Sequence, residues 1–267
     1  MKYSLPFYVG NKYLDMVDEI MIKYDADNEP SLIDFLDEHP NQRIVLRIAK
    51  ENKMTNKNYQ FLQAIVKQYA ERAVVIRFEE LVDSGKRFSL PHFFLYYCND
   101  IEQVLTLQNM GVTDVYITGN LCYQLKDIKD KIKCNIRVYP NVAQSSIEQS
   151  DAYTKFFIRP EDVKTFEPYI DYFEFYTDDV RRAADLYKIY CVQGHFEGDL
   201  SHIISGFPPF EVYNECIDPL FALEKLNCHK ACVYWGKDCK ICEKWLHLAQ
   251  TLYNKKYTIK INKQSGD

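Results

Sequence analysis

The chain has 267 residues, of which 47% are hydrophobic and 15% aromatic, so it can bury a sizeable core and is neither disordered nor of low complexity. Its 33 basic and 38 acidic residues give a net charge of −5, which excludes a general electrostatic attraction to nucleic acid. The N-terminal MKYSLPFYVGNKY contains no apolar run of signal-peptide length, and no stretch approaches the ~18 apolar residues of a membrane span. We therefore expect a cytoplasmic protein without a membrane segment.

Short runs rich in β-branched and aromatic residues recur along residues 1–190, and each has the length and composition of a β-strand. Eight such runs are Glu19–Tyr24, Arg43–Ile48, Ala73–Phe78, Phe93–Cys98, Asp114–Thr118, Asn135–Tyr139, Phe156–Arg159 and Tyr172–Tyr176. A ninth candidate, Tyr3–Tyr8, precedes them.

Amphipathic helices are predicted between most of these runs. Apolar residues share one face in Ser31–Glu38 and in Asn56–Arg72. Asn99–Met110 opens with an Asn-Asp capping signal and is followed by Gly111, a helix stop. Pro160 is suited to the first turn of another helix. A clear helical pattern covers Asp178–Tyr190, and weaker ones cover Glu79–Leu90 and Asn141–Tyr153.

Alternating strands and helices indicate a parallel sheet with crossover helices. Eight units within residues 1–190 fit an α/β fold of the (β/α)8 TIM-like barrel type. Polar residues at alternate positions, as in RIVLRI and NIRVY, favour the barrel over its alternative, an open doubly wound sheet. No glycine-rich loop of the G-x-G-x-x-G or P-loop type follows a strand, which removes the usual nucleotide sites of the open fold.

Residues 191–267 differ from the rest, because glycine, proline and cysteine are concentrated there. This part has few apolar residues outside the cysteine-rich stretch, so we expect an appendage that packs on the barrel rather than an independent domain. A helix over Glu243–Tyr253 and a short alternating run over Tyr257–Ile261 are predicted near its end.

Four cysteines, Cys228, Cys232, Cys239 and Cys242, are spaced C-x3-C, then six residues, then C-x2-C. Two such pairs can direct four thiolates at one centre, which suits a Zn2+ ion or a [4Fe-4S] cluster rather than calcium or magnesium. Disulfides or free thiols are the alternative, and the predicted reducing compartment makes disulfides the weaker explanation. Cys216 lies just upstream and is a substitute ligand for a cluster. The remaining cysteines, scattered through periodic segments, are expected to be buried free thiols.

The chemistry of a (β/α)8 barrel lies at the carboxyl ends of its strands. The polar residues expected there are Asp25, Lys50, Glu79, Asn120, Tyr139, Asn141, Gln144, Arg159, Glu161, Glu174 and Tyr176. Among them Arg159, Glu161 and Glu174 are the candidate catalytic residues, which would orient an anionic or hydrogen-bonding ligand. The alternative is a set of structural ion pairs, for example Arg159 with Glu174.

The segments GVTDVYITGNLCYQL (111–125) and NIRVYPNVAQS (135–145), with cysteines gathered after the last strands, resemble the collagenase-like peptidase superfamily. The resemblance covers residues 18–242 and implies a barrel that carries an iron–sulfur cluster on four cysteines. Cys216, Cys228 and Cys232 match part of that spacing, whereas the closely following C-x2-C pair departs from it. Barrel relatives in this group are oxygen-independent hydroxylases of RNA bases or quinone precursors.

Two main functions follow from these observations, and direct nucleic-acid binding through the lysines at 126–133 and 255–263 is a third, less favoured one. The first is an iron–sulfur or other metal-containing enzyme that modifies a small molecule or an RNA base at the strand ends. The second is a non-catalytic barrel scaffold with a structural zinc that binds a protein partner. Tyrosines such as Tyr169, Tyr187 and Tyr253 would supply its surface if they lie outside the core, and the alternative is that they cap the core with their hydroxyls in water.

Overall fold

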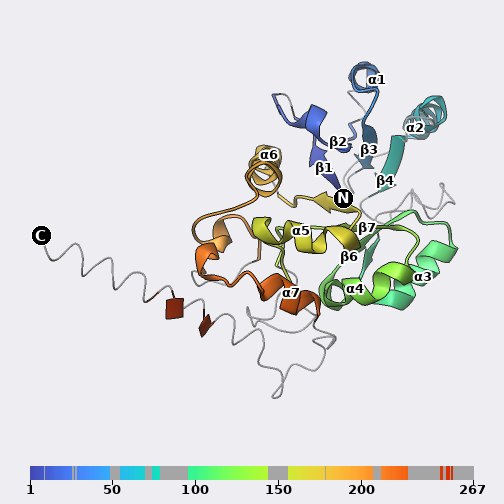
Figure 1. Ribbon diagram of the computed structural model, residues 1–267. Coiled ribbons are helices and arrows are strands. Elements are labelled where there is room, and N and C mark those ends of the chain that lie inside the picture. The colour runs from blue at the N-terminus through green and yellow to red at the C-terminus, as the bar shows by residue number, and fades with distance from the viewer. Residues whose placement is uncertain are drawn as a thin grey trace, which may run out of the picture.

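The computed structural model describes residues 1–8, 10–25, 27, 29–48, 55–69, 74–78, 96–143, 156–177, 179–206 and 212–227, with a few positions between 247 and 254. Within these residues an all-parallel sheet is surrounded by helices, as Figure 1 shows. None of the helices in the described ranges is long and apolar enough to cross a membrane.

The sheet has eight strands in the order β4-β3-β2-β1-β8-β7-β6-β5. Their bounds are β1 Lys2–Pro6, β2 Glu19–Lys23, β3 Arg43–Ile48, β4 Val74–Phe78, β5 Tyr97–Cys98, β6 Asp114–Ile117, β7 Asn135–Val138 and β8 Tyr172–Glu174. The first strand therefore pairs with both the second and the last, as in a barrel. No pairing between β4 and β5 is found among the described residues, so the structure shows a curled, half-barrel sheet.

Seven of the eight predicted strand runs contain strands, although for Phe93–Cys98 the described strand is only Tyr97–Cys98 and residues 93–95 lie outside the described part of the chain; Phe156–Arg159 was predicted wrongly. Phe157–Arg159 joins no ladder, and the ninth candidate run supplies β1 instead. The backbone of the mispredicted segment is satisfied elsewhere, since Ile158 N–H donates to the Pro140 carbonyl (3.1 Å) and the Tyr190 hydroxyl donates to the Ile158 carbonyl (2.8 Å). An apolar run can therefore form a buried loop, because its composition resembles that of a strand even where no hydrogen-bond ladder to a neighbouring strand forms.

The curl of the sheet is visible in contacts between strands that are far apart in its order. Arg43 on β3 donates hydrogen bonds of 3.2 and 3.0 Å to the Asp114 carboxylate on β6. These strands are five positions apart, about 24 Å in a flat sheet with strands ~4.8 Å apart. The sheet must therefore curve until its two halves face each other.

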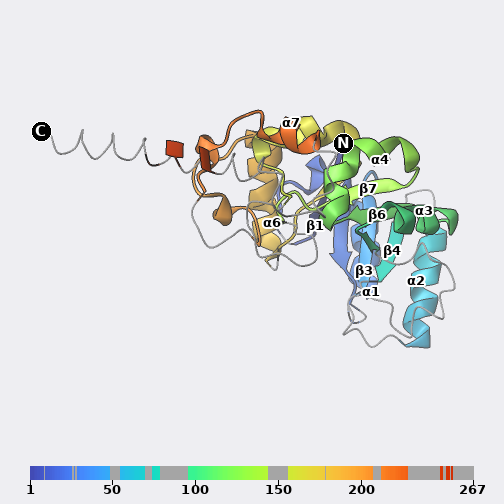
Figure 2. The ribbon, with the colours of Figure 1, turned by 90° about the horizontal axis from the view of Figure 1, so that it is seen from below.

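The helices are α1 Glu29–Glu38, α2 Asn56–Gln68, α3 Ile101–Asn109, α4 Leu125–Ile128, α5 Val163–Phe166, α6 Val180–Tyr187 and α7 Phe221–Leu226. Figure 2 shows the sheet and its helices from below, with α2 beside β4 and α6 beside β1. The predicted ends of α3 are confirmed, because the Asp100 side chain accepts a hydrogen bond from Gln103 N–H and Gly111 adopts a φ of 85°. Pro160 begins a 3-10 turn before α5, as its position suggested.

The two faces of the sheet differ in chemistry. The outer face carries the apolar residues of each strand, for example Ile44 and Leu46 of β3, which pack with Leu36 and Leu62 of the helices in one hydrophobic core. The alternate positions face inward and are mostly polar or aromatic, with Met21 and Val45 as apolar exceptions between the charged residues of β2 and β3. Inner-face residues of the described strands include Ser4, Glu19, Arg43, Arg47, Tyr97, Asp114, Tyr116, Arg137, Tyr172 and Glu174. The inner face is where a polar site can form.

The described part of residues 191–227 packs against the sheet and its helices. Helix α6 runs directly into a π-helical turn, Lys188–Gln193, across the boundary predicted at residue 190. Ala143 N–H donates to the Ser205 carbonyl (2.8 Å), which joins this part to the loop after β7. The predicted helices Glu79–Leu90 and most of Asn141–Tyr153, and the run Tyr257–Ile261, lie outside the described residues, whereas several positions between 247 and 254 are helical.

Candidate functional site

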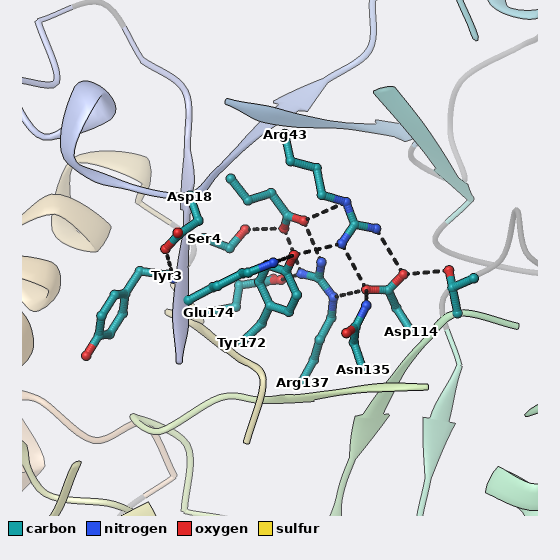
Figure 3. A network of polar contacts seen from close by, with 12 residues as sticks. Tyr3, Ser4, Asp18, Arg43, Asp114, Asn135, Arg137, Tyr172 and Glu174 are labelled. Carbon is teal, nitrogen blue, oxygen red and sulfur yellow. Dashed lines mark hydrogen bonds and ion pairs between the residues drawn. The ribbon is translucent and has the colours of Figure 1, made fainter. Parts of the chain in front are cut away.

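The inner face contains a buried ionic layer near the amino ends of the strands. Arg137 donates to both carboxylate oxygens of Glu19 (2.7 and 2.5 Å), and its Nε donates to Asp114 (3.2 Å). Arg43 completes the layer through Asp114 and through a 3.4 Å ion pair with Glu19, and the Ser4 hydroxyl donates to Glu19 (2.6 Å). Figure 3 shows Ser4, Arg43, Asp114 and Arg137 converging from strands in the two halves of the sheet.

This amino-side layer is balanced in charge and bonded internally. Burial alone would raise the pKa of Glu19, but the guanidinium groups of Arg137 and Arg43 and the Ser4 hydroxyl lower it below its ordinary value. The Arg137 guanidinium also lies 4.2 Å from the centre of the Tyr172 ring. Two arginines and two carboxylates thus satisfy one another, so we interpret the layer as the structural floor of the site.

A second layer lies nearer the carboxyl ends and is built around Arg47 and Glu174. Arg47 forms an ion pair with Glu174, whose other oxygen accepts a hydrogen bond from the Tyr116 hydroxyl. Arg47 also donates to the Tyr116 hydroxyl (2.9 Å). Glu174 lies 3.7 Å from Arg137, which links the two layers. The Nε of Arg47 is buried and has no hydrogen-bond partner among the described residues.

Four tyrosines form a continuous row beside this ion pair. The ring centres of Tyr97 and Tyr116 are 5.0 Å apart, those of Tyr116 and Tyr139 are 5.1 Å apart, and Tyr139 meets Tyr176 edge-on at 5.6 Å. Tyr97 and Tyr176 are 50% and 48% exposed, whereas Tyr116 and Tyr139 are buried. The two buried tyrosines therefore lie in the middle of the row, and the two half-exposed tyrosines form its ends.

Burial and the neighbouring Glu174 carboxylate raise the pKa values of Tyr116 and Tyr139 well above the ordinary tyrosine range. Both hydroxyls therefore keep their protons at neutral pH, and the Tyr116 hydroxyl donates its proton in the hydrogen bond to Glu174. The Tyr139 and Tyr97 hydroxyl oxygens are 3.3 Å apart. Together with Arg47, the row offers donors and ring faces to a ligand.

Asn141 fixes the backbone at this edge. Its amide nitrogen donates to the Tyr176 carbonyl (2.7 Å), and its amide oxygen accepts from Tyr176 N–H (2.9 Å). This two-point contact ties the end of β7 to the end of β8, so Tyr139 and Tyr176 keep a fixed relation. Sequence reasoning placed Asn141, Tyr139 and Tyr176 at the strand ends, and the structure brings the three together.

Of the three candidate catalytic residues, only Glu174 lies on the inner face. Arg159 binds both oxygens of Asp162 (2.6 and 2.8 Å) and donates to the Ile217 carbonyl (3.3 Å), rather than pairing with Glu174. Glu161 accepts hydrogen bonds from Phe196 N–H (2.9 Å) and the Asn214 amide (2.7 Å). In the described contacts, Arg159 and Glu161 hold residues 191–227 in place.

The other predicted site residues are placed as follows. Asp25 is exposed in the loop after β2, and Asn120 lies in the 3-10 turn after β6. Lys50, Glu79, Gln144 and the four candidate metal ligands Cys228, Cys232, Cys239 and Cys242 lie outside the described residues. Cys216 is buried, as is Tyr187, which the partner-binding hypothesis had placed on the surface.

The expectation of buried free thiols is confirmed for Cys98, Cys122 and Cys134, whereas Cys191 is free but only partly buried. Burial raises the pKa of Cys98 to about 12 and that of Cys134 to about 11. These thiols therefore remain protonated at neutral pH and are poor metal ligands. In the described residues no group of His, Cys, Asp or Glu side chains is arranged to hold a metal ion.

Sequence reasoning missed Arg47, Tyr97 and Tyr116. Each lies at an alternate position of a predicted strand. The two-residue alternation of polar or aromatic with apolar residues, as in RIVLRI and DVYIT, was therefore the pattern that could have identified them. That period identifies the inner face but not which strands meet across it. The chain matches no protein-family model, no curated protein and no solved structure.

Proposed function

We propose that the protein is a small-molecule-modifying enzyme whose ligand binds at the carboxyl edge of the sheet, against the Arg47–Glu174 pair and the tyrosine row. The main observation in support is that this edge combines an ion pair, protonated tyrosine hydroxyls and half-exposed rings on one face of the sheet. We further propose that the sheet closes between β4 and β5 into a complete (β/α)8 barrel, which would enclose this site. Position at the carboxyl ends of parallel strands supports an active site, since barrel enzymes bind their substrates there.

Each group has a role that follows from its contacts. Glu174 is the acceptor at the centre, because its carboxylate accepts a hydrogen bond from the Tyr116 hydroxyl and pairs with Arg47. Arg47 orients that carboxylate and keeps one N–H for a ligand. The exposed rings of Tyr97 and Tyr176 are the surfaces that a ligand reaches first. A proton leaving a bound ligand would be taken by Glu174, with Tyr116 as the adjoining donor.

The proposed cofactor is a [4Fe-4S] cluster or a Zn2+ ion held by Cys228, Cys232, Cys239 and Cys242. The support is their spacing and the resemblance to the collagenase-like group, which also suggests oxygen-independent hydroxylation of a small molecule or an RNA base. A cluster would supply electron transfer, and zinc would supply a structural link. The chain leading to these cysteines is anchored, because Arg159 binds the carbonyl just after Cys216.

The second candidate function is a non-catalytic scaffold with a structural zinc that presents a surface to a protein partner. It is favoured by the contacts of Arg159 and Glu161, since both side chains hold the appendage rather than facing the inner side of the sheet. The two functions differ in their metal and in the need for Glu174.

Anaerobic purification with metal and sulfide analysis distinguishes them. The enzyme hypothesis predicts a brown protein with about four iron and four sulfide ions per chain, lost in Cys239→Ala. A colourless protein with about one zinc ion per chain favours the scaffold. For the site itself, native mass spectrometry of the purified protein should reveal a bound small molecule whose occupancy falls in Glu174→Gln. Equal occupancy in that variant would argue against the carboxyl edge as the site.

A further inference from the structure

We propose that the tyrosine row is a one-electron relay between solvent and the interior of the sheet. Buried Tyr116 gives an electron through its neighbours to a strong one-electron oxidant, a high-valent transition-metal complex, and gives its proton to Glu174. The inference goes beyond the proposed function, because it requires the row and its carboxylate but no ligand at the carboxyl edge.

The row offers an electron short steps from the interior to the surface. The ring centre of Tyr116 is 5.0 Å from that of Tyr97 and 5.1 Å from that of Tyr139. The next step, from Tyr139 to Tyr176, is 5.6 Å. Electron tunnelling weakens exponentially with distance, so steps between adjoining rings are faster than a single jump through the protein. Tyr97 and Tyr176 are half-exposed, and an oxidant in solution can reach both ends of the row.

Tyr116 is bonded to a proton acceptor, which the oxidation of a buried tyrosine requires. A tyrosine that loses an electron becomes a strong acid, and its proton must leave with the electron. The Tyr116 hydroxyl donates a hydrogen bond to the Glu174 carboxylate, so the proton can move along a contact that already exists.

The step balances in electrons and protons. The Tyr116 phenol loses one electron, which reduces the metal complex by one unit, and one proton, which forms a bond to a carboxylate oxygen of Glu174. The products are a neutral tyrosyl radical and a protonated glutamic acid. An electron returned to the row by a reductant reverses both transfers.

The surroundings of Tyr116 determine how strong the oxidant must be. Burial and the Glu174 carboxylate raise the pKa of Tyr116, so the resting state is the neutral phenol. Arg47 donates to the Tyr116 hydroxyl (2.9 Å), and the guanidinium carbon of Arg137 lies 5.9 Å from the ring centre. Both positive charges oppose the loss of an electron, so only a strong oxidant acts on Tyr116. Because the ring is 2% exposed, its radical is shielded from solvent and from other radicals and should be long-lived.

A second tyrosine cluster has similar spacing but a different hydrogen-bond acceptor. The ring centre of Tyr187 is 5.7 Å from that of Tyr3 and 5.3 Å from that of Tyr13. Tyr187 is also buried, but its hydroxyl donates to the backbone carbonyl of Met16 (3.3 Å). A backbone carbonyl does not take up a proton at neutral pH, so Tyr187 should form no long-lived neutral radical. Tyr187→Phe is therefore the matched control.

Flash photolysis of the full-length protein tests the relay. Excited tris(bipyridine)ruthenium(II), with pentaamminechlorocobalt(III) as the irreversible electron acceptor, generates ruthenium(III) as the one-electron oxidant. Electron paramagnetic resonance of samples frozen after the flash detects tyrosyl radicals, and transient absorption gives their rate of formation. We expect a long-lived radical that falls by about tenfold or more in Tyr116→Phe and is unchanged in Tyr187→Phe.

Further variants separate the path of the electron from that of the proton. The double variant Tyr97→Phe, Tyr176→Phe removes both exposed ends, and Glu174→Gln removes the proton acceptor. Each should slow the oxidation of Tyr116 by about tenfold, the effect of ~1.4 kcal/mol on the activation free energy. In heavy water the unmodified protein should also react more slowly, because the same proton moves, and this measurement needs no variant to fold.

A long-lived radical that persists in Tyr116→Phe, or none in the unmodified protein, would overturn the proposal. An unchanged rate in the double variant would do the same, because the electron would then bypass the row. Equal rates in ordinary and heavy water would exclude Glu174 as the acceptor and the balanced step with it. This experiment needs no ligand and the occupancy measurement needs no oxidant, so failure of the relay is distinguishable from failure of the proposed function.

Discussion

Arg137 of β7 and Glu19 of β2 form a two-point ion pair across the inner face, with side chains only 4% and 0% exposed. The two strands lie three positions apart in the sheet, so the pair connects segments that share no ladder. Its surroundings, including Asp114 and Arg43, leave neither charge unbalanced. The stability of the curled sheet therefore depends on both members being present.

Arg137→Met should lower the free energy of unfolding by about 3–5 kcal/mol, because it leaves the Glu19 carboxylate buried with reduced compensation. Adding Glu19→Leu to that variant should restore part of the loss, since an apolar pair carries no uncompensated charge. Urea denaturation measures both. Arg181→Met, on the exposed face of α6, is the control and should change stability by no more than about 0.5 kcal/mol. Arg137→Met as stable as the control would contradict the assignment.

The stability of the protein should fall in acid through Glu19. Its native pKa is lowered, because the pairing with Arg137 and Arg43 outweighs the opposing effect of burial. The unfolded carboxyl group, with a pKa near 4.5, therefore binds a proton at higher pH than the native one does. The stabilisation is complete above that value and is lost as the pH falls through the native pKa. Urea midpoints below pH ~4.5 should fall less steeply in Glu19→Gln than in the unmodified protein, and identical slopes would refute this origin.

Arg159→Lys should loosen residues 212–227, because lysine cannot bind both oxygens of Asp162 and the Ile217 carbonyl at once. We expect a loss of about 1–3 kcal/mol in local stability, seen as faster amide hydrogen exchange in that segment. Lys164→Met on the neighbouring helix α5 is the control and should leave exchange unchanged. Unchanged exchange combined with weaker ligand binding would instead favour the catalytic role expected from the sequence.

Cys98, Cys122 and Cys134 should resist alkylation by iodoacetamide in the folded protein at neutral pH. Their burial raises their pKa values, to about 12 for Cys98 and about 11 for Cys134, so the reactive thiolate is scarce and inaccessible. Peptide mass spectrometry after brief labelling measures this, and labelling in urea is the control for complete reaction. Rapid modification of Cys122 in the native state would contradict its position in the core.

The local structure and the division of each strand into two faces could be predicted from local sequence patterns. In RIVLRI the period of two residues places Ile44 and Leu46 on one face and Arg43 and Arg47 on the other, because successive side chains of a strand point in opposite directions. The same logic located Glu174 and Tyr139 at the carboxyl edge. It failed for Phe156–Arg159, since an apolar run is as suitable for a buried loop as for a strand.

Which charged side chains pair with one another depends on how the whole chain folds. An ion pair between Arg159 and Glu174 was the structural alternative, but Arg159 binds Asp162, and Glu174 pairs with Arg47, which lies 127 positions away in the chain. The alternation of residues along a strand predicts to which face of the sheet each side chain points. The partner that a side chain meets across the sheet depends instead on how strongly the sheet curls and on the relative shift of its strands. That curvature is a property of all the strands together, so no local pattern records it.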